Sequence, residues 1–296
     1  MVYLKAILSL AGLGAVFGIM LGLAARKFAV ESDPRVEKIT GVLPGANCGG
    51  CGYPGCSGLA SAIVTGSAPV DACPVGGQVV ADRVSEIMGV QPAPARERQV
   101  AKVMCGGGED KATSRFAYIG IRDCGAAGLV SGGPKACTFG CLGFGTCVKA
   151  CPFGAMEMGA DGLPVIDEAK CTGCGKCIEA CPRGIIALVP VSARTQVLCR
   201  SHARGAEVRK VCKVGCIGCG ICVKTCPNSA IVLEDNLARI IPDKCDNCGK
   251  CVEKCPTRCI VMTSQRDLHT VVTGGVGAGK GLSTGTEGPG GCCVAK

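Results

Sequence analysis

The apolar residues of this chain form one long run near the N-terminus and only short, interrupted runs afterwards. Residues 6–25 are twenty positions without a charged side chain, enough for a helix that crosses a bilayer. Arg26 and Lys27 follow, so the positive-inside rule places the rest of the chain in the cytoplasm, although Lys5 weakens the asymmetry. A signal peptide is the alternative, which the length of the run disfavours. We expect a single-pass anchor in the cell inner (plasma) membrane.

Glycines recur on one face of this expected helix. Gly14, Gly18 and Gly22 are spaced four residues apart, which leaves a smooth stripe where a second helix can approach closely. The pattern predicts a transmembrane partner, while the alternative is that glycine is simply common in membrane helices. The run contains no ionisable residue, so we do not expect it to carry an ion pathway.

The short apolar runs later in the chain predict paired strands. Residues 230–233 and 238–241 are strand-like and flank a turn at 234–236, and a cysteine-rich loop and a short helix follow them. Residues 155–158 and 163–166 repeat this order about seventy residues earlier. Repetition of one supersecondary unit at nearly constant spacing indicates an internal duplication.

Cysteine is the most informative residue type, with 27 among 296 residues, mostly in tight runs that end in Cys-Pro. Three runs have the spacing CxxCxxCxxxCP that is typical of [4Fe–4S] clusters. Disulfides are one alternative, but cysteines three residues apart are poorly placed to pair with each other. Zinc is another, although zinc ribbons need only two CxxC pairs. The runs are Cys171, Cys174, Cys177 and Cys181; Cys216, Cys219, Cys222 and Cys226; and Cys245, Cys248, Cys251 and Cys255.

The spacing also predicts how ligands are shared between clusters. In a two-cluster ferredoxin module, the fourth cysteine of each run ligates the neighbouring cluster. One loop, before Cys151, is irregular, with gaps of three and five residues between its cysteines. The predicted ligand sets are Cys216, Cys219, Cys222 and Cys255; Cys226, Cys245, Cys248 and Cys251; Cys151, Cys171, Cys174 and Cys177; and Cys137, Cys141, Cys147 and Cys181.

A separate segment supplies four thiolates by itself, so it predicts one cluster that borrows no ligand. Its apolar positions after residue 58 predict a short helix packed on the cluster. Zinc stays an alternative here, because four cysteines alone do not select the metal. The cysteines of this segment are Cys48, Cys51, Cys56 and Cys73.

Seven cysteines remain outside these five clusters. Four of them flank the first repeat on both sides, so they could converge on a sixth cluster, or they could be buried as small apolar residues. The four are Cys105, Cys124, Cys199 and Cys212; the others are Cys259, which we expect to pack beside a cluster, and Cys292 and Cys293 near the C-terminus.

Composition supports cluster-filled interiors. The chain has no Trp, three Tyr and six Phe, but 46 glycines, which allow backbone N–H groups to approach sulfur. The formal charge of +9 counts every cysteine as neutral, whereas five oxidised four-thiolate cubes would cancel roughly ten positive charges. The basic surplus therefore fits a counter-charge to clusters, and the scarcity of aromatic residues argues against nucleic-acid binding.

These elements predict an α+β protein with an N-terminal transmembrane helix, a small four-Cys iron–sulfur domain and two ferredoxin-like two-cluster modules. The expected segments are an anchor at 1–27, the four-Cys domain at 28–89, a linker and connecting segment at 90–133, module 1 at 134–190, a connector at 191–210, module 2 at 211–263, and a Gly-rich disordered tail at 264–296.

Taken in order, the uncharged helix, the residues from Arg26 to Glu31, the NCGGCGYPGC segment at 47–56 and the terminal module resemble the B subunit of the Rnf (also Rsx) electron transport complex. The resemblance covers residues 1–263, and the extra module at 134–190 is similar to the long form of that subunit. It implies an electron relay in an ion-translocating ferredoxin:NAD⁺ oxidoreductase. Soluble ferredoxin would be the donor, and membrane and flavin- or NAD-binding subunits would be partners.

The residues agree with a relay that has no substrate-converting site of its own, because the chain has no Rossmann fingerprint and no plausible general base. We therefore expect a translocase subunit with no catalytic residue and no cofactor besides its [4Fe–4S] clusters, five or six in number. The alternatives are a stand-alone membrane-tethered polyferredoxin, a reductase of a redox-sensing regulator, and a non-redox metal scaffold.

Overall fold

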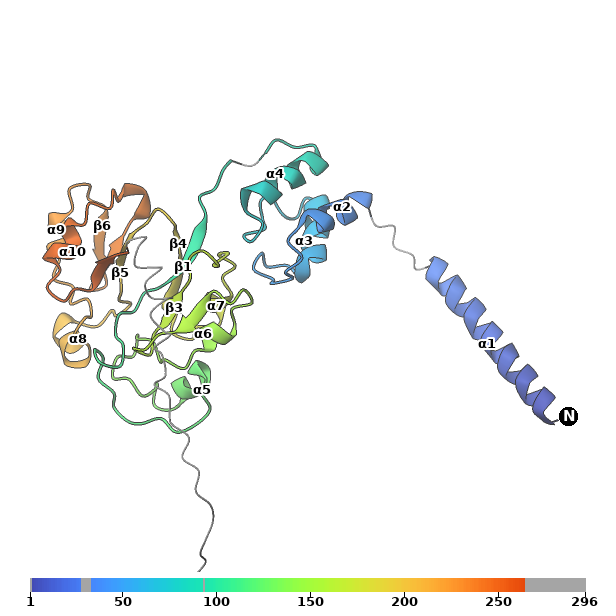
Figure 1. Ribbon diagram of the computed structural model, residues 1–296, viewed down its shortest axis with the longest axis horizontal. Coiled ribbons are helices and arrows are strands. Elements are labelled where there is room, and N and C mark those ends of the chain that lie inside the picture. The colour runs from blue at the N-terminus through green and yellow to red at the C-terminus, as the bar shows by residue number, and fades with distance from the viewer. Residues whose placement is uncertain (1, 28–32, 93, 264–296) are drawn as a thin grey trace, which may run out of the picture. The chain divides into compact units, whose positions relative to one another are not determined.

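The computed structural model describes residues 2–27, 33–92 and 94–263, which form two compact units. The first unit contains the chain up to Arg98 together with the loop 172–176, and the second contains the remainder (Figure 1). The expectations about the tail at 264–296, including Cys292 and Cys293, lie outside the described residues.

The first element is the helix α1 (Val2–Lys27), at the position of the apolar run. Its last turn carries Arg26 and Lys27. Within the part of the chain that the structure describes, no helix has both the length and the apolar character needed to cross a membrane. The side chains at positions 4, 6, 9 and 25 of α1 lie outside that part.

Three further helices pack together in the first unit: α2 (Pro34–Val42), α3 (Gly55–Val64) and α4 (Gly77–Met88). Asp33 caps α2 by accepting a hydrogen bond from the backbone N–H of Arg35 at 2.8 Å. Ile39, Leu59, Ile63 and Val84 from the three helices are at most 2% exposed and form the shared core. The predicted helix after residue 58 is thus confirmed as part of α3.

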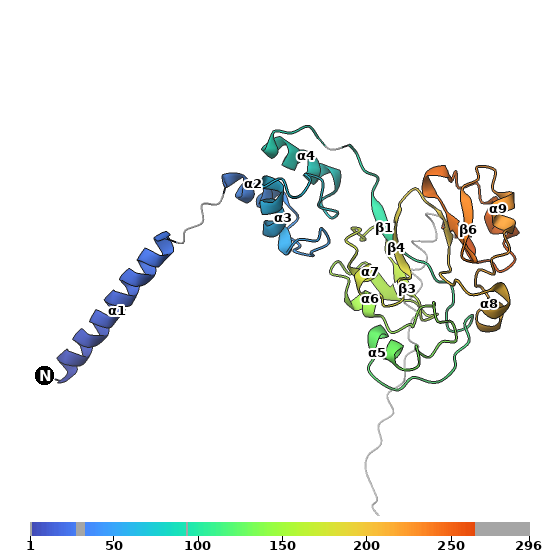
Figure 2. The ribbon, with the colours of Figure 1, turned by 180° about the vertical axis from the view of Figure 1, so that it is seen from behind.

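The second unit contains two modules with the same layout, each built from an inner hairpin and an outer antiparallel pair (Figures 1 and 2). In module 1 the hairpin is β2 (Met156–Met158) with β3 (Pro164–Ile166), and the outer pair is β1 (Gln99–Val103) with β4 (Ile186–Pro190). In module 2 they are β6 (Ile231–Glu234) with β7 (Leu237–Ile240), and β5 (Thr195–Val197) with β8 (Ile260–Met262).

Both predicted hairpins are confirmed, and local chemistry explains the second. Asp235 and Asn236 between β6 and β7 have φ values of 46° and 63°. Two consecutive positive φ angles make a type I′ turn, whose twist suits a hairpin and which Asp and Asn tolerate. The outer strands β1 and β5 lie in segments expected to be linker and connector. Their partners β4 and β8 are more than sixty residues away in the sequence, so no local pattern predicts the pairing.

In the two modules, each cysteine loop leads into a short helix that contains one of the cysteines. These helices are α6 (Thr146–Lys149), α7 (Lys176–Glu179), α9 (Ile221–Thr225) and α10 (Lys250–Lys254), and they contain Cys147, Cys177, Cys222 and Cys251. A glycine with φ between 70° and 79° precedes each helix. The other elements are α5 (Cys124–Leu129), α8 (Gly205–Val211) and the 3₁₀ helix η1 (Pro242–Lys244).

Asn247 fixes the last cysteine loop to the start of β5. Its Oδ1 accepts hydrogen bonds from the backbone N–H groups of Arg194 and Thr195, each at 3.0 Å, and its Nδ2 donates to Ser192 O at 3.0 Å. The residue has a φ of 56°, which asparagine adopts more readily than most residues. One side chain therefore holds the loop between Cys245 and Cys248 against the sheet.

We expect Asn247→Ala to speed iron release from the holoprotein, because it removes three hydrogen bonds and strains the left-handed backbone, at a cost of roughly 1–3 kcal/mol. The measurement is the loss of cluster absorbance in a chelator under anaerobic, mildly denaturing conditions. Asn247→Gly relieves the strain without restoring the bonds, so its rate should fall between those of the wild type and Asn247→Ala. Equal rates for all three proteins would contradict this role of Asn247.

Candidate functional site

In module 2 the thiols gather into two groups. Five of them line one small cavity, together with Ala238 and Ile260 of the adjoining strands. Four of the five, Cys216, Cys219, Cys222 and Cys255, are the residues predicted as one ligand set, and the fifth is Cys259. The structure also places the second predicted set together, because Cys251 lies within electrostatic range of the thiols of Cys226, Cys245 and Cys248.

In module 1 one predicted set has a different member. Cys141, Cys147 and Cys181 line a small cavity, but the fourth cysteine there is Cys124. Cys137, which the irregular loop suggests, lies elsewhere. Burial raises the pKa of Cys147 to about 12, and the neighbouring thiols of Cys141, Cys181 and Cys124 add to the shift.

A small hydrogen-bond network explains the position of Cys124. Asp123 caps α5 by accepting from the N–H of Ala126 at 2.9 Å. Thr146, the first residue of α6, donates its hydroxyl to Asp123 Oδ2 at 2.8 Å and accepts from the N–H of Cys124 at 2.7 Å. The network joins α5 to α6 and so places Cys124 next to Cys147. Spacing alone could not reveal this, because 22 residues separate Cys124 from Thr146.

The other predicted set of module 1 lies on the opposite cysteine loop. Cys171 and Cys177 are buried in the module core, and the partly buried Cys151 packs against the same core. Cys174, between them in sequence, is also buried. The backbone N–H of Ala101 in β1 donates to the sulfur of Cys171 at 3.4 Å.

In the first unit, the predicted four-cysteine set lies around α3. Cys51, Cys56 and Cys73 pack against the core of that unit, and Cys48 is half-buried in the preceding loop. Burial raises the pKa of Cys73, and the thiols of Cys51 and Cys56 act in the same direction. Asn47, with a φ of 45°, accepts the N–H of Cys56 at 2.8 Å and thereby closes the loop.

A further small cavity, of about 20 Å³, is lined by cysteines that belong to no regular run. They are Cys105, Cys137, Cys199 and Cys212, and we name the space the interface cavity because residues of both modules line it. The sequence predicted Cys124 in this group and Cys137 beside Cys141 and Cys147. The structure has the two cysteines the other way round, because α5 places Cys124 next to α6.

These environments fit the thiolate ligands of iron–sulfur clusters. Burial raises the pKa of Cys141 and of Cys199 to about 11, so these thiols become thiolates only beside a cation such as iron. Backbone N–H groups point at several sulfurs: Gly76 at Cys73, Ala101 at Cys171, and Ala230 at Cys226, over 3.3–3.4 Å. Such donors stabilise the charge of a cluster and tune its potential.

Cys259 lines the cavity of Cys216 and Cys255 but belongs to none of the predicted ligand sets. It is 3% exposed, and its sulfur lies 3.6 Å from that of Cys255. A hydrogen bond with Cys259 lowers the pKa of Cys216. This position agrees with the expectation that Cys259 packs beside a ligand set.

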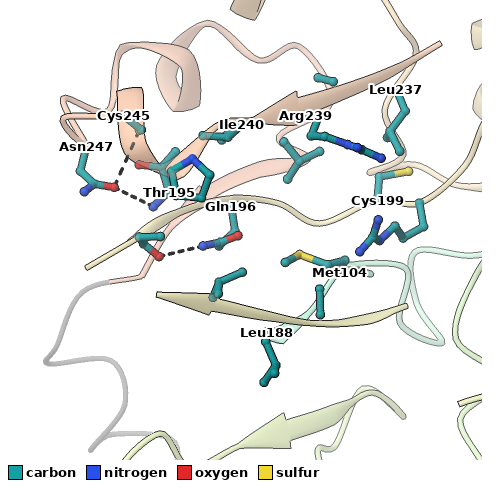
Figure 3. A pocket seen from close by; sticks show the side chains of 17 residues that line it. Met104, Leu188, Thr195, Gln196, Cys199, Leu237, Arg239, Ile240, Cys245 and Asn247 are labelled. Carbon is teal, nitrogen blue, oxygen red and sulfur yellow. Dashed lines mark hydrogen bonds between the residues drawn. The ribbon is translucent and has the colours of Figure 1, made fainter. Parts of the chain in front are cut away.

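A larger groove, of about 340 Å³, separates the outer strands of the two modules (Figure 3). Leu188 of β4 lies on one side, and Gln196 of β5 and Ile240 of β7 lie on the other. Cys199 also lines the groove, and Figure 3 shows it at the end where Leu237 lies. Cys199 is thus positioned where the modules meet.

Comparison with family models finds three matches in the chain. The family described as "Putative Fe-S cluster" matches residues 43–75, and two families described as "4Fe-4S dicluster domain" match residues 136–186 and 215–259. The matched segments contain the four-cysteine set of the first unit and the regular runs of both modules. Cys105, Cys124, Cys199 and Cys212 lie outside all three matches.

Whole-chain comparison finds relatives that cover most of the sequence. The chain is 51% identical over 234 residues to the B subunit of the proton-translocating ferredoxin:NAD(+) oxidoreductase complex of Clostridium ljungdahlii, covering 79% of this chain and 82% of the relative. It is 46% identical over 244 residues to the B subunit of the ion-translocating oxidoreductase complex of Methanosarcina acetivorans, covering 82% and 92%.

The B subunit of the Na(+)-translocating ferredoxin:NAD(+) oxidoreductase complex of Acetobacterium woodii is 50% identical over 232 residues, covering 78% of this chain and 69% of the relative. These identities extend well beyond the cysteine motifs, and the three family matches account for the grouped thiols. The chain therefore belongs to the B subunits of Rnf-type ion-translocating oxidoreductase complexes and is an iron–sulfur electron-transfer subunit.

Proposed function

We propose that this chain accepts electrons from reduced ferredoxin and relays them through [4Fe–4S] clusters to flavin-bearing partner subunits of the complex. The observation that carries the proposal is the grouping of cysteines in fours within compact modules. Bound clusters would supply one-electron redox chemistry. The chain's own residues hold them, exclude water and present N–H groups to sulfur.

Five ligand sets are proposed, supported by the spacing of the cysteines and by the positions of the thiols. Four are those expected from spacing, and the fifth replaces Cys137 by Cys124. The proposed sets are Cys48, Cys51, Cys56 and Cys73; Cys151, Cys171, Cys174 and Cys177; Cys124, Cys141, Cys147 and Cys181; Cys216, Cys219, Cys222 and Cys255; and Cys226, Cys245, Cys248 and Cys251.

Membership of a complex favours the relay over a stand-alone polyferredoxin, because relatives of this length are named as complex subunits. The names of two relatives also supply the proposed donor and final acceptor, ferredoxin and NAD⁺. We further propose that residues 6–25 anchor the chain in the membrane with its clusters on the cytoplasmic side. The support is the uncharged twenty-residue sequence and the following Arg26 and Lys27.

The relay is tested by anaerobic purification of the full chain, with iron, acid-labile sulfide and zinc measured per chain. We expect iron and sulfide in equal amounts and visible absorbance that reduced ferredoxin bleaches. Cys124→Ser should lower the iron content by about four atoms and weaken the bleaching, because the cubane loses a ligand. Cys293→Ser is the matched control, because Cys293 is a cysteine outside every proposed set, and this variant should keep its iron.

Zinc without sulfide would overturn the relay altogether. Unchanged iron content in Cys124→Ser would instead show that Cys124 is not a ligand, and so overturn its assignment in place of Cys137. Recovery of flavin-containing subunits with the tagged chain is expected for a complex member, whereas a chain that always purifies alone would support the stand-alone polyferredoxin.

The anchor is tested by deleting residues 2–27 from the chain in its own cell. We expect the deleted form to leave the membrane fraction while keeping its clusters, since the grouped cysteines all lie beyond the deletion. Fractionation followed by iron analysis measures both properties. Retention of the deleted form in membranes at the wild-type level, in cells that lack the partner subunits, would contradict an anchor in this segment.

A further inference from the structure

The interface cavity brings together four cysteines from four separate segments of the second unit: Cys105, Cys137, Cys199 and Cys212. No regular motif contains more than one of them, and the family matches include only Cys137. Backbone hydrogen bonds place each cysteine, and charged side chains lie beside the four sulfurs.

Cys105 is held where the two modules join. The preceding residue, Met104, donates its N–H to Ile185 O of module 1 at 2.7 Å. The following residue, Gly106, donates its N–H to Leu198 O, next to β5 of module 2, at 3.0 Å. Cys199 directly follows Leu198, so the same pair of hydrogen bonds places Cys105 and Cys199 at one junction.

Cys137 and Cys212 are brought together by the segment 111–115, which runs between their own segments. On one side Thr113 donates its N–H to Val211 O at 2.9 Å, and an antiparallel bridge pairs Ala112 with Cys212. On the other side Thr113 O accepts the N–H of Ala136 at 2.8 Å. A single extended segment therefore positions both cysteines, which are 75 residues apart in the sequence.

Gly107 shows how closely the sulfurs approach this backbone. A Cβ atom at this position would lie 3.3 Å from the sulfur of Cys212 and 3.8 Å from that of Cys105. A larger residue would press on the thiol of Cys212 and touch that of Cys105, so glycine lets both sulfurs lie close to the backbone. The interface cavity has the same volume, about 20 Å³, as each of the cavities lined by two of the proposed cluster sets.

The charges at the interface cavity favour an anionic occupant. Lys135 lines it and is only 5% exposed, and its Nζ donates to Gly107 O at 2.8 Å. Arg200 also lines it, with a buried Nε that has no hydrogen-bond partner. Among the described residues that line the cavity, none is acidic. Two cations would balance an oxidised four-thiolate cubane, whose net charge is about −2.

The interface cavity also adjoins a proposed cluster site on each side. In module 1, the backbone N–H of Cys141 donates to the sulfur of Cys105 at 3.5 Å. In module 2, the backbone N–H of Cys216 hydrogen-bonds to the sulfur of Cys199. Cys141 and Cys216 are proposed ligands of the two neighbouring clusters, so each contact joins two sites directly through one hydrogen bond.

We propose that Cys105, Cys137, Cys199 and Cys212 bind a further [4Fe–4S] cluster that connects the two ferredoxin-like modules into one electron path. The inference rests on the proposed function. In each transfer the cluster of one module loses one electron, the connecting cluster gains it and then passes it to the cluster of the other module. No bond is made or broken.

The test is iron, sulfide and zinc counting on the anaerobically purified full chain, with Cys212→Ser and the control Cys293→Ser measured beside the wild type. We expect about 24 iron atoms in the wild type and the control, and about 20 in Cys212→Ser. About 20 iron atoms in all three proteins would overturn the connecting cluster and leave the five-cluster relay intact. About 20 iron atoms together with one zinc atom in the wild type would show that the four cysteines bind zinc. Absence of labile sulfide would overturn the relay itself.

A second pair of variants tests the site without removing a ligand. Lys135→Met should lower the reduction potential of the connecting cluster, because a buried positive charge stabilises the reduced, more negative state. Lys135→Arg keeps the charge and should restore the wild-type potential. Redox titration followed by electron paramagnetic resonance measures both. Identical potentials in the wild type and Lys135→Met, with iron content retained, would contradict a cluster beside Lys135.

Discussion

The folded state depends on compensation of buried thiolate charge. Its interiors contain cysteines where other proteins place large apolar side chains, and the pKa of several of these thiols is raised because burial disfavours the charged form. Bound iron would supply the missing positive charge, and backbone N–H groups and Lys135 would add to it. Cluster binding and folding would therefore be coupled in these modules, since the same residues provide the core and the proposed ligands.

This coupling explains why the secondary structure is so sparse. Strands of three to five residues and helices of a single turn would not be stable alone, but the short helices α6, α7, α9 and α10 each contain a cysteine that a cluster would fix. Glycines with positive φ before α6, α7, α9 and α10 let the loops turn tightly into the helices that carry Cys147, Cys177, Cys222 and Cys251. The loops, rather than the sheets, determine the positions of the ligands.

The sequence predicts what is local. The hairpins β2–β3 and β6–β7, helix α3 and the regular cysteine runs all follow from short-range spacing or alternation. What the sequence does not reveal depends on contacts between distant segments. The outer strands β1 and β5 pair far along the chain, and the exchange of Cys124 for Cys137 depends on Asp123 and Thr146, which are ordinary residues until α5 and α6 meet. Likewise, the sequence does not show that Lys135 and Arg200 lie beside the same four cysteines, because this depends on the convergence of four segments.

The hydrogen bonds of Met104 and Gly106 have a consequence for how the modules move. Because consecutive stretches of one short segment bond to both modules, neither can rotate away without breaking that segment's backbone contacts. The distance between redox centres on the two sides would thus be set by these backbone hydrogen bonds rather than by diffusion of tethered domains. Electron transfer between the modules should then depend on the tunnelling distance and the driving force. Its rate should be insensitive to solvent viscosity, because no domain has to move between the two sites.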